Sequence, residues 1–467
     1  MKNSEGSKKT TSLVPRRTFL GMTAGAAGAL TIGPRQLFGS TGPLSANDKL
    51  NIAAVGVGGM GKGNLEKCET ENIVALCDVD MEFAAKTFAK YPKAKTYQDF
   101  RVMFDQQKDI DAVIVATPDH THAVIAMAAM ERGKHVYVQK PLTHSVYEAR
   151  LLTEAARQYK VATQMGNQGH SGDGARLICE WIWAGAIGPV REVHTWTNRP
   201  VWPQGVEVER PTETPAVPST FDWDLWIGPA PFRPYHPTYH PSRWRAWWDF
   251  GTGSLGDMGC HIIDPVFWAL KLKYPVSVEG CISAYWQEFF KKTEPRNETY
   301  PRSTIVRFKF PAREGMPEVR MTWWDGGLLP PRPDALAEGQ AMGDDDGGVL
   351  FIGDEGIVMC GCYGRDPVLL PEARMRDFKQ PPETLERIPN GSKGHEQNWI
   401  QACKGGKPAC SNFDYSGPLT ETVLMGNLAV RFPDRRLLWD GMKMEVTNDK
   451  DATTYVRRKY RQGWSLS

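Results

Sequence analysis

The fold of this chain is decided by one stretch near its N-terminal end, Leu50-Asn51-Ile52-Ala53-Ala54-Val55-Gly56-Val57-Gly58-Gly59-Met60-Gly61. A short apolar run breaks into glycines and then continues with a helix-like pattern, which predicts a strand, a tight turn and a helix. Gly56 would allow the turn, Gly58 would let the backbone approach a pyrophosphate, and Gly61 would let the helix pack close to the strand. The first amides of such a helix point at the anion. Ordinary structural turns share this glycine spacing, so it predicts a nucleotide site only together with the unit that follows.

A second apolar run covers residues 73–78 and ends in a carboxylate, Asp78. An acid at this place, about twenty residues after the glycines, binds the ribose hydroxyls in dinucleotide-binding folds. Asp80 is the alternative, slightly further along the chain. Because a carboxylate repels a 2′-phosphate, we expect NAD as the cofactor rather than NADP.

The chain between residues 46 and 168 alternates strand-length apolar runs with helix-length amphipathic runs. This pattern is typical of a parallel sheet covered by helices on both faces, so we expect a Rossmann domain over residues 46–168. Two of the later strands, residues 109–118 and 133–141, end at the edge of the sheet where ligands of open α/β sheets bind. Lys140 lies at the second of these strand ends.

The rest of the chain, residues 169–467, has a different composition. Residues 194–250, here called the Trp-rich segment, are rich in Trp, Pro and His without a clear period, which is typical of a functional or interface segment. Residues 276–359 alternate polar and apolar positions, as in the strands of a large, mostly antiparallel sheet. We therefore predict an α/β protein in which the Rossmann domain is followed by a substrate-binding α/β domain with an open sheet.

The composition excludes several classes of partner. The chain has a formal net charge of +2 and no run of Lys and Arg with interleaved aromatic residues, so no nucleic-acid partner is indicated. The nine cysteines include no C-x-x-C pair, and their spacing does not predict a disulfide. The His and Asp residues show no metal-ligand spacing, so no metal site is predicted.

A segment ahead of the fold resembles a twin-arginine export signal. Arg16-Arg17-Thr18-Phe19-Leu20 precedes a Gly/Ala-rich apolar run over residues 21–32. This run is too short and too rich in small residues for a comfortable membrane span. We expect residues 1–45 to be a signal peptide and linker, and the mature protein to be periplasmic without a membrane span. The alternative is a disordered basic tail.

The second informative segment is residues 251–264, where glycines give way to an apolar helical pattern. Asp257 and His261 lie about one turn apart on the same side of that helix, so both can face one cavity. An imidazole that titrates near neutrality beside a carboxylate suits proton transfer from an alcohol while a nicotinamide takes the hydride. The alternative is an Asp and a His that only cover the start of a helix.

Taken together and in this order, four motifs resemble those of the Gfo/Idh/MocA oxidoreductase family. They are the glycine fingerprint, Thr117-Pro118 followed by His122, Lys140-Pro141 at a strand end, and Asp257-x-Gly259-x-His261. The resemblance covers nearly the whole chain after the export segment. It implies NAD(P) in the crevice, sugars or cyclitols as substrates, and a catalytic set of Lys140, Asp257 and His261.

In this set Lys140 would polarise the reacting hydroxyl and His261 would be the general base in oxidation. Asp257 would bind the substrate and tune His261. The alternative for Lys140 is an ordinary surface lysine before a proline. The resemblance and the glycine turn together predict a list of cofactor-binding residues: Gly56, Gly58, Gly59, Met60, Gly61, Asp78, Thr117, Pro118, His122, Gln139 and Asn167.

The chain departs from the family pattern at one position, where Gln139 stands in place of the usual Glu before the lysine. A carboxylate there would hold the lysine charged, whereas a neutral amide can hydrogen-bond but leaves the ammonium less anchored. This departure concerns the direction and rate of the reaction more than the fold.

The Trp-rich segment offers flat apolar faces and forked donors of the kind that bind sugar rings and their hydroxyls. From it we predict Trp226, Arg243 and Trp244 as substrate-binding residues, together with His170. Aromatic clusters also form ordinary cores, so only part of the tryptophans are expected in a pocket.

Three functions are compatible with the sequence. The first is an NAD(P)-dependent oxidoreductase acting on a hydroxyl of a sugar, glycoside or cyclitol, such as a glycoside 3-dehydrogenase. The second is a glycosidase or lyase that uses tightly bound NAD transiently. The third is a non-catalytic sugar-binding protein, which the presence of Lys140, Asp257 and His261 disfavours.

The export signal bears on the cofactor. Because free NAD is scarce outside the cytoplasm, we expect it to be loaded before export and tightly bound. By analogy with the family we also expect a homodimer or homotetramer. Residues 448–464 are expected to pack back onto the first domain.

Overall fold

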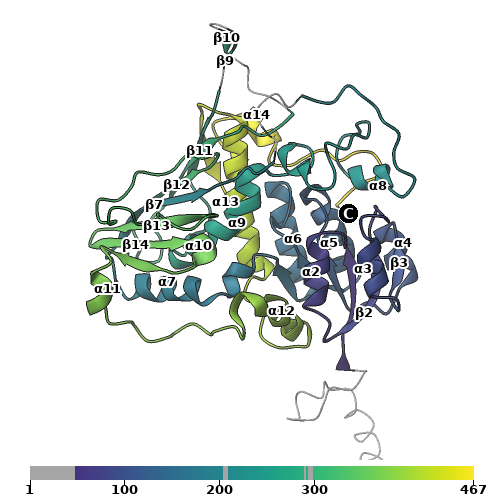
Figure 1. Cartoon of the computed structure of the whole chain (residues 1–467), viewed down its shortest axis with the longest axis horizontal. Helices are drawn as coiled ribbons and strands as arrows, with labels where there is room; N and C mark the ends of the chain where they lie inside the picture. The colour runs from purple at the N-terminus through teal and green to yellow at the C-terminus, as the bar shows by residue number, and fades with distance from the viewer. Residues whose placement is uncertain are drawn as a thin grey trace, which may run out of the picture. The chain divides into compact units, whose positions relative to one another are not determined.

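The computed structural model describes residues 48–202, 204, 209–284, 286–288, 291–292 and 298–466. The predicted signal peptide and linker, residues 1–45, lie outside the described residues. Residues Leu50–Ser467 form one compact unit, which contains two large sheets (Figure 1). Within the described ranges, no helix is long and apolar enough to cross a membrane.

The first sheet has six strands in the order β3-β2-β1-β4-β5-β6, and all neighbouring strands are parallel. Its strands are β1 (Asn51–Val55), β2 (Asn72–Cys77), β3 (Lys95–Tyr97), β4 (Ala112–Val115), β5 (His135–Val138) and β6 (Thr163–Met165). The connecting helices are α2 (Met60–Glu66), α3 (Ala85–Lys90), α4 (Phe100–Gln106), α5 (Asp119–Glu131) and α6 (Val146–Tyr159). The strand order reverses between β1 and β4, which is where dinucleotides bind in Rossmann sheets. The predicted Rossmann architecture is confirmed.

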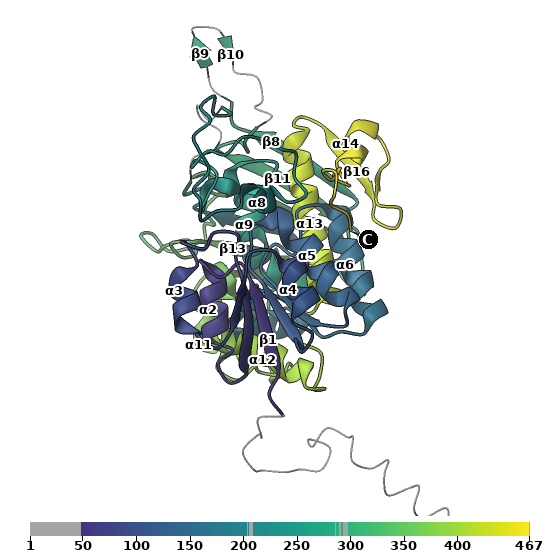
Figure 2. The ribbon, with the colours of Figure 1, turned by 90° about the vertical axis from the view of Figure 1, so that its right-hand side faces the viewer.

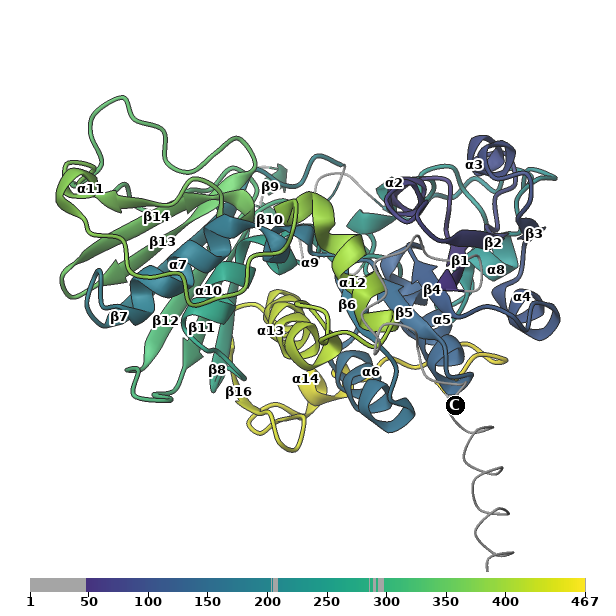
Figure 3. The same cartoon turned by 90° about the horizontal axis from the view of Figure 1, so that it is seen from below.

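Both faces of this sheet are buried, which explains why its strands are continuous apolar runs. Ile52 of β1 belongs to a core with α2 and α3, and the next residue, Ala53, belongs to the core with α4, α5 and α6 on the other face. Helix α12 (His395–Cys403) comes from late in the chain and adds Trp399 to the first of these cores (Figure 3).

The second sheet has nine strands in the order β15-β14-β13-β7-β12-β11-β8-β16-β17, and only β7 and β12 pair in parallel. Its strands are β7 (Val190–Thr197), β8 (Ser277–Ile282), β11 (Thr304–Phe310), β12 (Val319–Trp324), β13 (Gly347–Gly353), β14 (Gly356–Gly361), β15 (Val368–Leu370), β16 (Arg436–Asp440) and β17 (Glu445–Val446). The helices that share a core with it are α7 (Asp173–Trp183), α9 (Gly253–Ile262), α10 (Asp264–Ala269) and α13 (Phe413–Arg431). The predicted large, mostly antiparallel open sheet is confirmed.

The remaining elements are short. They are the hairpin of β9 (Trp286–Glu288) and β10 (Lys291–Lys292), the helices α8 (Trp223–Ile227), α11 (Arg374–Asp377) and α14 (Lys450–Thr454), and the 3-10 turns η3 (Gln168–Ser171), η4 (Arg243–Ala246), η5 (Cys362–Gly364) and η6 (Gly391–Gly394). Helix α8 and turn η4 belong to the Trp-rich segment. That segment forms a hydrophobic core of its own, with Trp223, Trp226, Trp244 and Trp247 buried in it.

The glycine turn after β1 has the backbone geometry that the sequence predicts. Gly56 adopts a φ of 82°, a conformation that favours glycine. A Cβ on Gly61 would lie 2.0 Å from the carbonyl oxygen of Gly56, so α2 packs against the turn only because residue 61 has no side chain. Gly63, in the same helix, has no atom within 4 Å of the position its Cβ would take.

These two glycines form a matched pair for a stability test. Gly61→Ala should lower the free energy of unfolding by about 1–3 kcal/mol, the usual cost of overpacking. Gly63→Ala should raise it by about 0.5–1 kcal/mol, because alanine favours a helix over glycine. Urea unfolding of both variants measures the difference. Equal stability of the two variants would contradict the close packing of α2 on the turn.

Candidate active site

A cavity of about 300 Å³ lies over the carboxyl ends of β1, β2, β4 and β5. Its walls come from the Rossmann strand ends, the Trp-rich segment and the C-terminal end of the chain. The predicted site residues that line it are Gly56, Gly58, Gly59, Met60, Asp78, Thr117, Pro118, Gln139, Lys140, Trp226 and Trp244. Cofactors of open α/β sheets bind on this side of the strands.

Asp78, at the end of β2, ties the glycine turn to its neighbouring strand. Its Oδ2 accepts hydrogen bonds from the backbone N–H groups of Val57 at 2.8 Å and Gly58 at 3.1 Å. Its Oδ1 accepts one from Asp80 N–H at 3.0 Å and keeps capacity for a ribose hydroxyl. Burial raises the pKa of Asp78 to about 6, although the three hydrogen bonds from backbone N–H groups favour the ionised form and oppose this rise. The carboxylate is therefore mostly ionised at pH 7.

The glycine turn fits the pyrophosphate of NAD. A Cβ on Gly58 would lie 2.1 Å from a ring carbon of Phe83, so a side chain there would have to displace that ring. Within Met60–Glu66, helix α2 has no acidic residue in its first turn and no side-chain cap. Its first amides are therefore not committed to a side chain and suit an anion.

Lys140 and Asp257 form the central contact of the site. The Lys140 Nζ donates hydrogen bonds to the Asp257 carbonyl oxygen at 2.6 Å and to its Oδ1 at 2.9 Å. Lys140 follows β5 of the first sheet, and Asp257 lies in α9 beside the second sheet. Their side chains are 14% and 11% exposed. The structure thus brings together two residues that the sequence placed in one site.

Positive side chains surround Asp257. The Nε of Arg245 lies 3.2 Å from Asp257 Oδ1, and the Nε of Arg199 lies 3.5 Å from Oδ2. Burial by itself would raise the pKa of Asp257, but the charges of Lys140, Arg245 and Arg199 hold it well below its usual value. Asp257 therefore stays ionised across the physiological pH range.

His261 follows Asp257 by one turn of α9, as the helical spacing predicts. Its buried ring contacts Tyr363 edge-on, with the centroids 4.6 Å apart, and its Nδ1 has no hydrogen-bond partner among the described residues. Burial and the charge of Lys140 lower the pKa of His261 well below 6.5. The expected titration near neutrality is thus replaced by an imidazole that stays neutral at pH 7.

Asp119, the first residue of α5, was not predicted but lines the cavity. Its Oδ2 accepts a hydrogen bond from the Thr252 hydroxyl at 2.5 Å. Burial raises the pKa of Asp119 to about 7, against the opposing effects of Thr252, Arg245 and Lys140. In this site the group that titrates near neutrality is therefore a carboxyl rather than the predicted imidazole.

The side chain of Gln139 bonds to Asn64 and not to the contact that Lys140 makes with Asp257. Its Nε2 donates to Asn64 Oδ1 at 2.9 Å, and Asn64 in turn donates to Glu396 Oε1 at 2.7 Å. Lys140 is anchored by Asp257, so a glutamine at position 139 does not leave the ammonium loose. This corrects the expectation drawn from the departure at that position.

His122 is not among the residues that line the cavity. Its ring nitrogens lie 2.9 Å from the carbonyl oxygen of Pro141 and 2.8 Å from that of Thr117. The buried ring joins the loops that follow β4 and β5. By these contacts it helps to hold the backbone at Thr117 and beside Lys140 in place.

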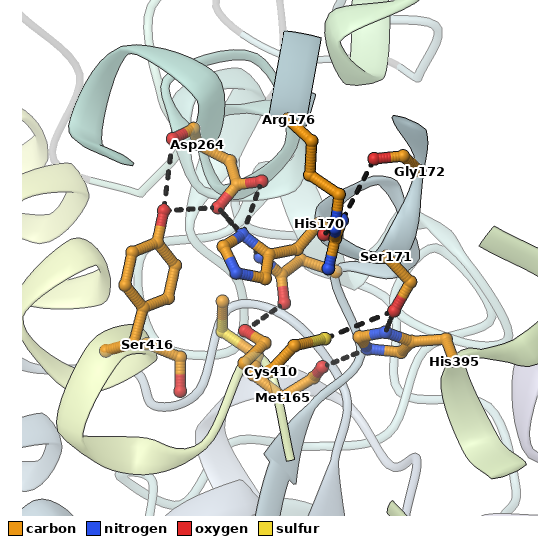
Figure 4. A network of polar contacts seen from close by, with 12 residues as sticks. Met165, His170, Ser171, Gly172, Arg176, Asp264, His395, Cys410 and Ser416 are labelled. Carbon is orange, nitrogen blue, oxygen red and sulfur yellow. Dashed lines mark hydrogen bonds and ion pairs between the residues drawn. The ribbon is translucent and has the colours of Figure 1, made fainter. Parts of the chain in front are cut away.

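Asn167 and His170 are buried and also lie outside the cavity lining. Figure 4 shows His170 in a polar network with Asp264. The His170 Nδ1 lies 3.0 Å from Asp264 Oδ1, and the Asn167 Nδ2 donates to the same oxygen at 3.2 Å. The His170 ring stacks on Trp268 with the centroids 4.3 Å apart. These contacts hold η3 against α10. In the described part of the chain, no group of three or more His, Cys, Asp or Glu side chains could hold a metal ion.

The run Arg243-Trp244-Arg245 contributes a different arginine to the cavity from the one predicted. Arg243 is exposed and outside the cavity lining, whereas Trp244 is buried in the cavity wall. Arg245 lines the cavity, and its guanidinium lies over the Trp244 ring at 4.2 Å. The arginine that reaches Asp257 is therefore the second of the pair.

Asp119, Arg199 and Trp464 are among the site residues that the sequence analysis missed, and of the two arginines beside Trp244 it selected Arg243 rather than Arg245. Only Arg245 carried a local signal, because it follows Trp244 directly. Trp464 lines the cavity from the C-terminal end of the chain. The prediction that this end packs back onto the Rossmann layer agrees with that position.

Comparison with known proteins assigns this arrangement to a family. The model of the oxidoreductase family with an NAD-binding Rossmann fold matches residues 50–167, and the model of its C-terminal alpha/beta domain matches residues 193–288. The chain belongs to the Gfo/Idh/MocA oxidoreductase family. Its first sheet is the NAD-binding Rossmann fold of that family.

Individual relatives are distant. Levoglucosan dehydrogenase of Pseudarthrobacter phenanthrenivorans is 24% identical over 46% of this chain and 50% of that protein. A glycosyl hydrolase family 109 protein of Shewanella woodyi is 32% identical over 30% of this chain and 32% of that protein. The chain thus spans half or less of the length of these curated relatives. The WlbA dehydrogenase of Bordetella pertussis, solved with NADH and UDP-GlcNAcA, shares the fold with a TM-score of 0.57 at 15% identity, over 84% of this chain and 99% of that chain.

The raised pKa of Asp78 predicts a pH-dependent affinity for NAD. The carboxyl group is neutral below its pKa of about 6 and then cannot accept from the ribose as a carboxylate. Binding should therefore be about tenfold weaker at pH 5 than at pH 7. Asp78→Asn should bind NAD weakly at both values. Calorimetric titration of nucleotide-stripped protein measures this, and a wild-type affinity that is the same at both pH values would contradict the assignment of Asp78 to the ribose.

Proposed function

We propose that this protein is an NAD-dependent oxidoreductase that transfers a hydride between the nicotinamide and a hydroxyl of a sugar, glycoside or cyclitol. The observation that carries the proposal is the contact of Lys140 with Asp257 beside the carboxyl end of β5. In a Rossmann sheet the half formed by β1 to β3 receives the adenosine, and the half formed by β4 to β6 receives the nicotinamide. The pair therefore lies where a substrate must meet the reactive end of the cofactor.

Bound NAD supplies the hydride acceptor. The Lys140 ammonium has three N–H donors, of which Asp257 accepts two, so one remains for the oxygen of the reacting hydroxyl. This hydrogen bond stabilises the negative charge that develops on the oxygen as its proton leaves. Asp257 thus fixes the direction in which Lys140 donates.

His261 is the proposed acceptor of the hydroxyl proton. Its imidazole is neutral at pH 7 because burial and Lys140 lower its pKa, and a neutral imidazole has one nitrogen able to accept a proton. A buried polar atom without a partner, such as its Nδ1, costs about 1–3 kcal/mol. A hydrogen bond to the substrate would remove that cost. The buried side chains of Trp226 and Trp244 line the cavity that Lys140 also lines, and they exclude water from it.

The proposed carbohydrate substrate has two supports. Levoglucosan dehydrogenase is a relative named for a sugar derivative. The cavity also combines indole rings with the Arg245 guanidinium, a surface that suits the apolar faces and hydroxyls of a sugar ring.

A homodimer or homotetramer is part of the proposal. The helices of the second sheet pack on one of its faces (Figure 3). The opposite face carries the half-buried apolar side chains of Ile305, Trp324 and Ile357. Such a face suits contact with a second copy of the chain.

Removal of the Lys140 ammonium should abolish most of the turnover. Lys140→Met is expected to lower kcat by about 10²- to 10⁴-fold, the usual contribution of a positioned proton donor or acceptor. NAD should stay bound, because Asp78 and the glycine turn are unchanged. Lys86→Met, at an exposed position of α3, is the matched control and should keep full activity. The assay follows the absorbance of reduced nicotinamide with alkyl glucosides, inositols and amino sugars, and unchanged turnover in Lys140→Met would contradict the catalytic role.

The family 109 glycosyl hydrolase relative favours a second function, cleavage of a glycosidic bond with transient use of NAD. Oxidation at C3 would acidify the C2–H bond, and loss of that proton would expel the aglycone from C1. Water then adds across C1 and C2, and the hydride returns to C3, so no net oxidation remains. Aryl glycosides separate the two functions. Release of aglycone without accumulation of NADH supports cleavage, and NADH without aglycone supports the dehydrogenase.

We further propose that the protein is exported with NAD already bound. The support is the twin-arginine motif Arg16-Arg17-Thr18-Phe19-Leu20 with its Gly/Ala-rich run, together with a cavity wall built from three parts of the chain. The wild-type protein should be found in the periplasm with stoichiometric NAD, and replacement of Arg16 and Arg17 by Lys should keep it in the cytoplasm. Periplasmic wild-type protein without nicotinamide nucleotide would contradict loading before export.

A further inference from the structure

The last residues of the chain return to the Rossmann layer. After α14 the C-terminal segment, residues 455–466, passes α6, where the Tyr460 hydroxyl bonds the Glu148 carboxylate. Figures 1 and 2 show its yellow ribbon leaving α14 and running along the Rossmann helices. Tyr460 and Trp464 pack against the main hydrophobic core. The segment is therefore part of the packed fold.

Arg461 fastens this segment to the Trp-rich segment at the end of α8. Its backbone N–H donates to the Pro229 carbonyl at 3.0 Å. Its guanidinium donates to the carbonyl oxygens of Gly228 and Asp224, each at 3.0 Å, and pairs with the Asp224 carboxylate. One residue thus makes four polar contacts with a single turn of the neighbouring segment.

A turn directly after Arg461 brings Trp464 to the cavity. The backbone N–H of Trp464 donates to the Arg461 carbonyl oxygen at 3.1 Å. Gly463 adopts a φ of 87°, as the third residue of a type II turn requires. The indole lies 6.2 Å from the ring of Phe100 and 4.8 Å from the guanidinium of Arg101, which covers it. Because Arg101 covers one face, Trp464 lines the cavity with its other face or its edge.

The end of the cavity at which Trp464 lies is the adenosine end. Phe100 follows β3, β3 pairs with β2, and Asp78 directly follows β2. These strands form the half of a Rossmann sheet that receives adenosine. Phe100, Leu225 and Trp464 give this end the apolar, aromatic lining that an adenine ring needs. Lys140 lies at the end of β5, in the other half of the sheet.

We propose that Trp464 is a wall of the adenine site and that Arg461 holds it in place, so that bound NAD leaves only when the C-terminal segment detaches. This inference rests on the proposed function, because it requires NAD in the cavity. Helix α14 is the last helix of the described chain. No strand of either sheet lies beyond α14 in the described chain, so detachment of that segment would leave both sheets intact. Slow release of NAD follows from the fold, and it suits a protein that cannot reload the cofactor after export.

The first test removes the indole. Trp464→Ala should exchange NAD roughly tenfold faster or more, because an aromatic side chain against a base contributes about that factor. Nucleotide-stripped protein is loaded with labelled NAD, and exchange against an excess of unlabelled NAD is followed. Trp464→Phe keeps an aromatic ring and should exchange at an intermediate rate. Lys459→Ala, at an exposed position of the same segment, is the matched control and should exchange as the wild type does. Exchange in Trp464→Ala at the wild-type rate would overturn the inference.

Two fragments of NAD locate the effect in the cavity. ADP-ribose contains the adenine and nicotinamide mononucleotide does not. Trp464→Ala should lower the affinity for ADP-ribose by roughly the factor by which it speeds the exchange of NAD. It should leave the affinity for nicotinamide mononucleotide unchanged. Equal weakening of both fragments would indicate a general structural effect and would overturn the assignment to the adenine end.

The second test removes the anchor and keeps the indole. Arg461→Ala should also speed the exchange of NAD. Asp224→Ala removes the carboxylate of the same ion pair and should speed it as well, and the double variant should be no faster than Arg461→Ala, because the two residues act through one contact. Exchange in Arg461→Ala at the wild-type rate would overturn the role of Arg461.

The outcomes separate this inference from the function on which it rests. A wild-type protein that binds neither NAD nor ADP-ribose would overturn the proposed function and the inference together. A wild-type protein that binds both, with variants that exchange NAD at the wild-type rate, would overturn only the role of the C-terminal segment.

Discussion

The contact of Lys140 with Asp257 is the interaction on which the geometry of the site depends. It joins the end of β5 in the first sheet to α9 beside the second sheet, through two hydrogen bonds of 2.6 and 2.9 Å. Both side chains are largely buried. Loss of Asp257 would cost about 3–5 kcal/mol, because the buried Lys140 ammonium would lose the carboxylate that it bonds. A shift of α9 would break this contact and would also move His261. The stability of the fold and the alignment of the reacting groups therefore depend on the same contact.

The same charges decide which groups can change protonation. Lys140, Arg199 and Arg245 hold Asp257 ionised, and Lys140 together with burial keeps His261 neutral. Neither member of the Asp257 and His261 pair titrates near pH 7. The groups that titrate near pH 7 are instead two carboxyl groups, Asp78 with a pKa of about 6 and Asp119 with a pKa of about 7, and burial raises the pKa of each. A pH dependence of this protein near neutrality therefore reports on the ribose end and on the start of α5 before it reports on the imidazole.

The sequence predicted the parts of the structure that local patterns determine. Gly56 and Gly61 are required by the conformation and packing of a single turn, and Asp257 and His261 are placed by the period of one helix. Residues whose role depends on tertiary packing were predicted poorly. The buried ring of His122 contacts two backbone carbonyls that come together only when the loops after β4 and β5 meet. Arg199 and Asp119 reach the site from segments far apart in the chain and carry no local signal. His170 was assigned by its residue type, but the position of Asp264 decides its role.

The walls of the cofactor cavity come from parts of the chain that are far apart in sequence. The glycine turn lies near the start of the fold, Trp226 and Trp244 lie near its middle, and Trp464 lies close to its end. A nucleotide can therefore meet the Rossmann strands as soon as they fold, but it is enclosed only after the last residues have packed. Enclosure is thus a late property of the folded chain, and it needs no change in the strands that bind the cofactor. The twin-arginine route proposed for this protein carries folded proteins, so the same late packing that closes the cavity would also keep the cofactor in place during transport.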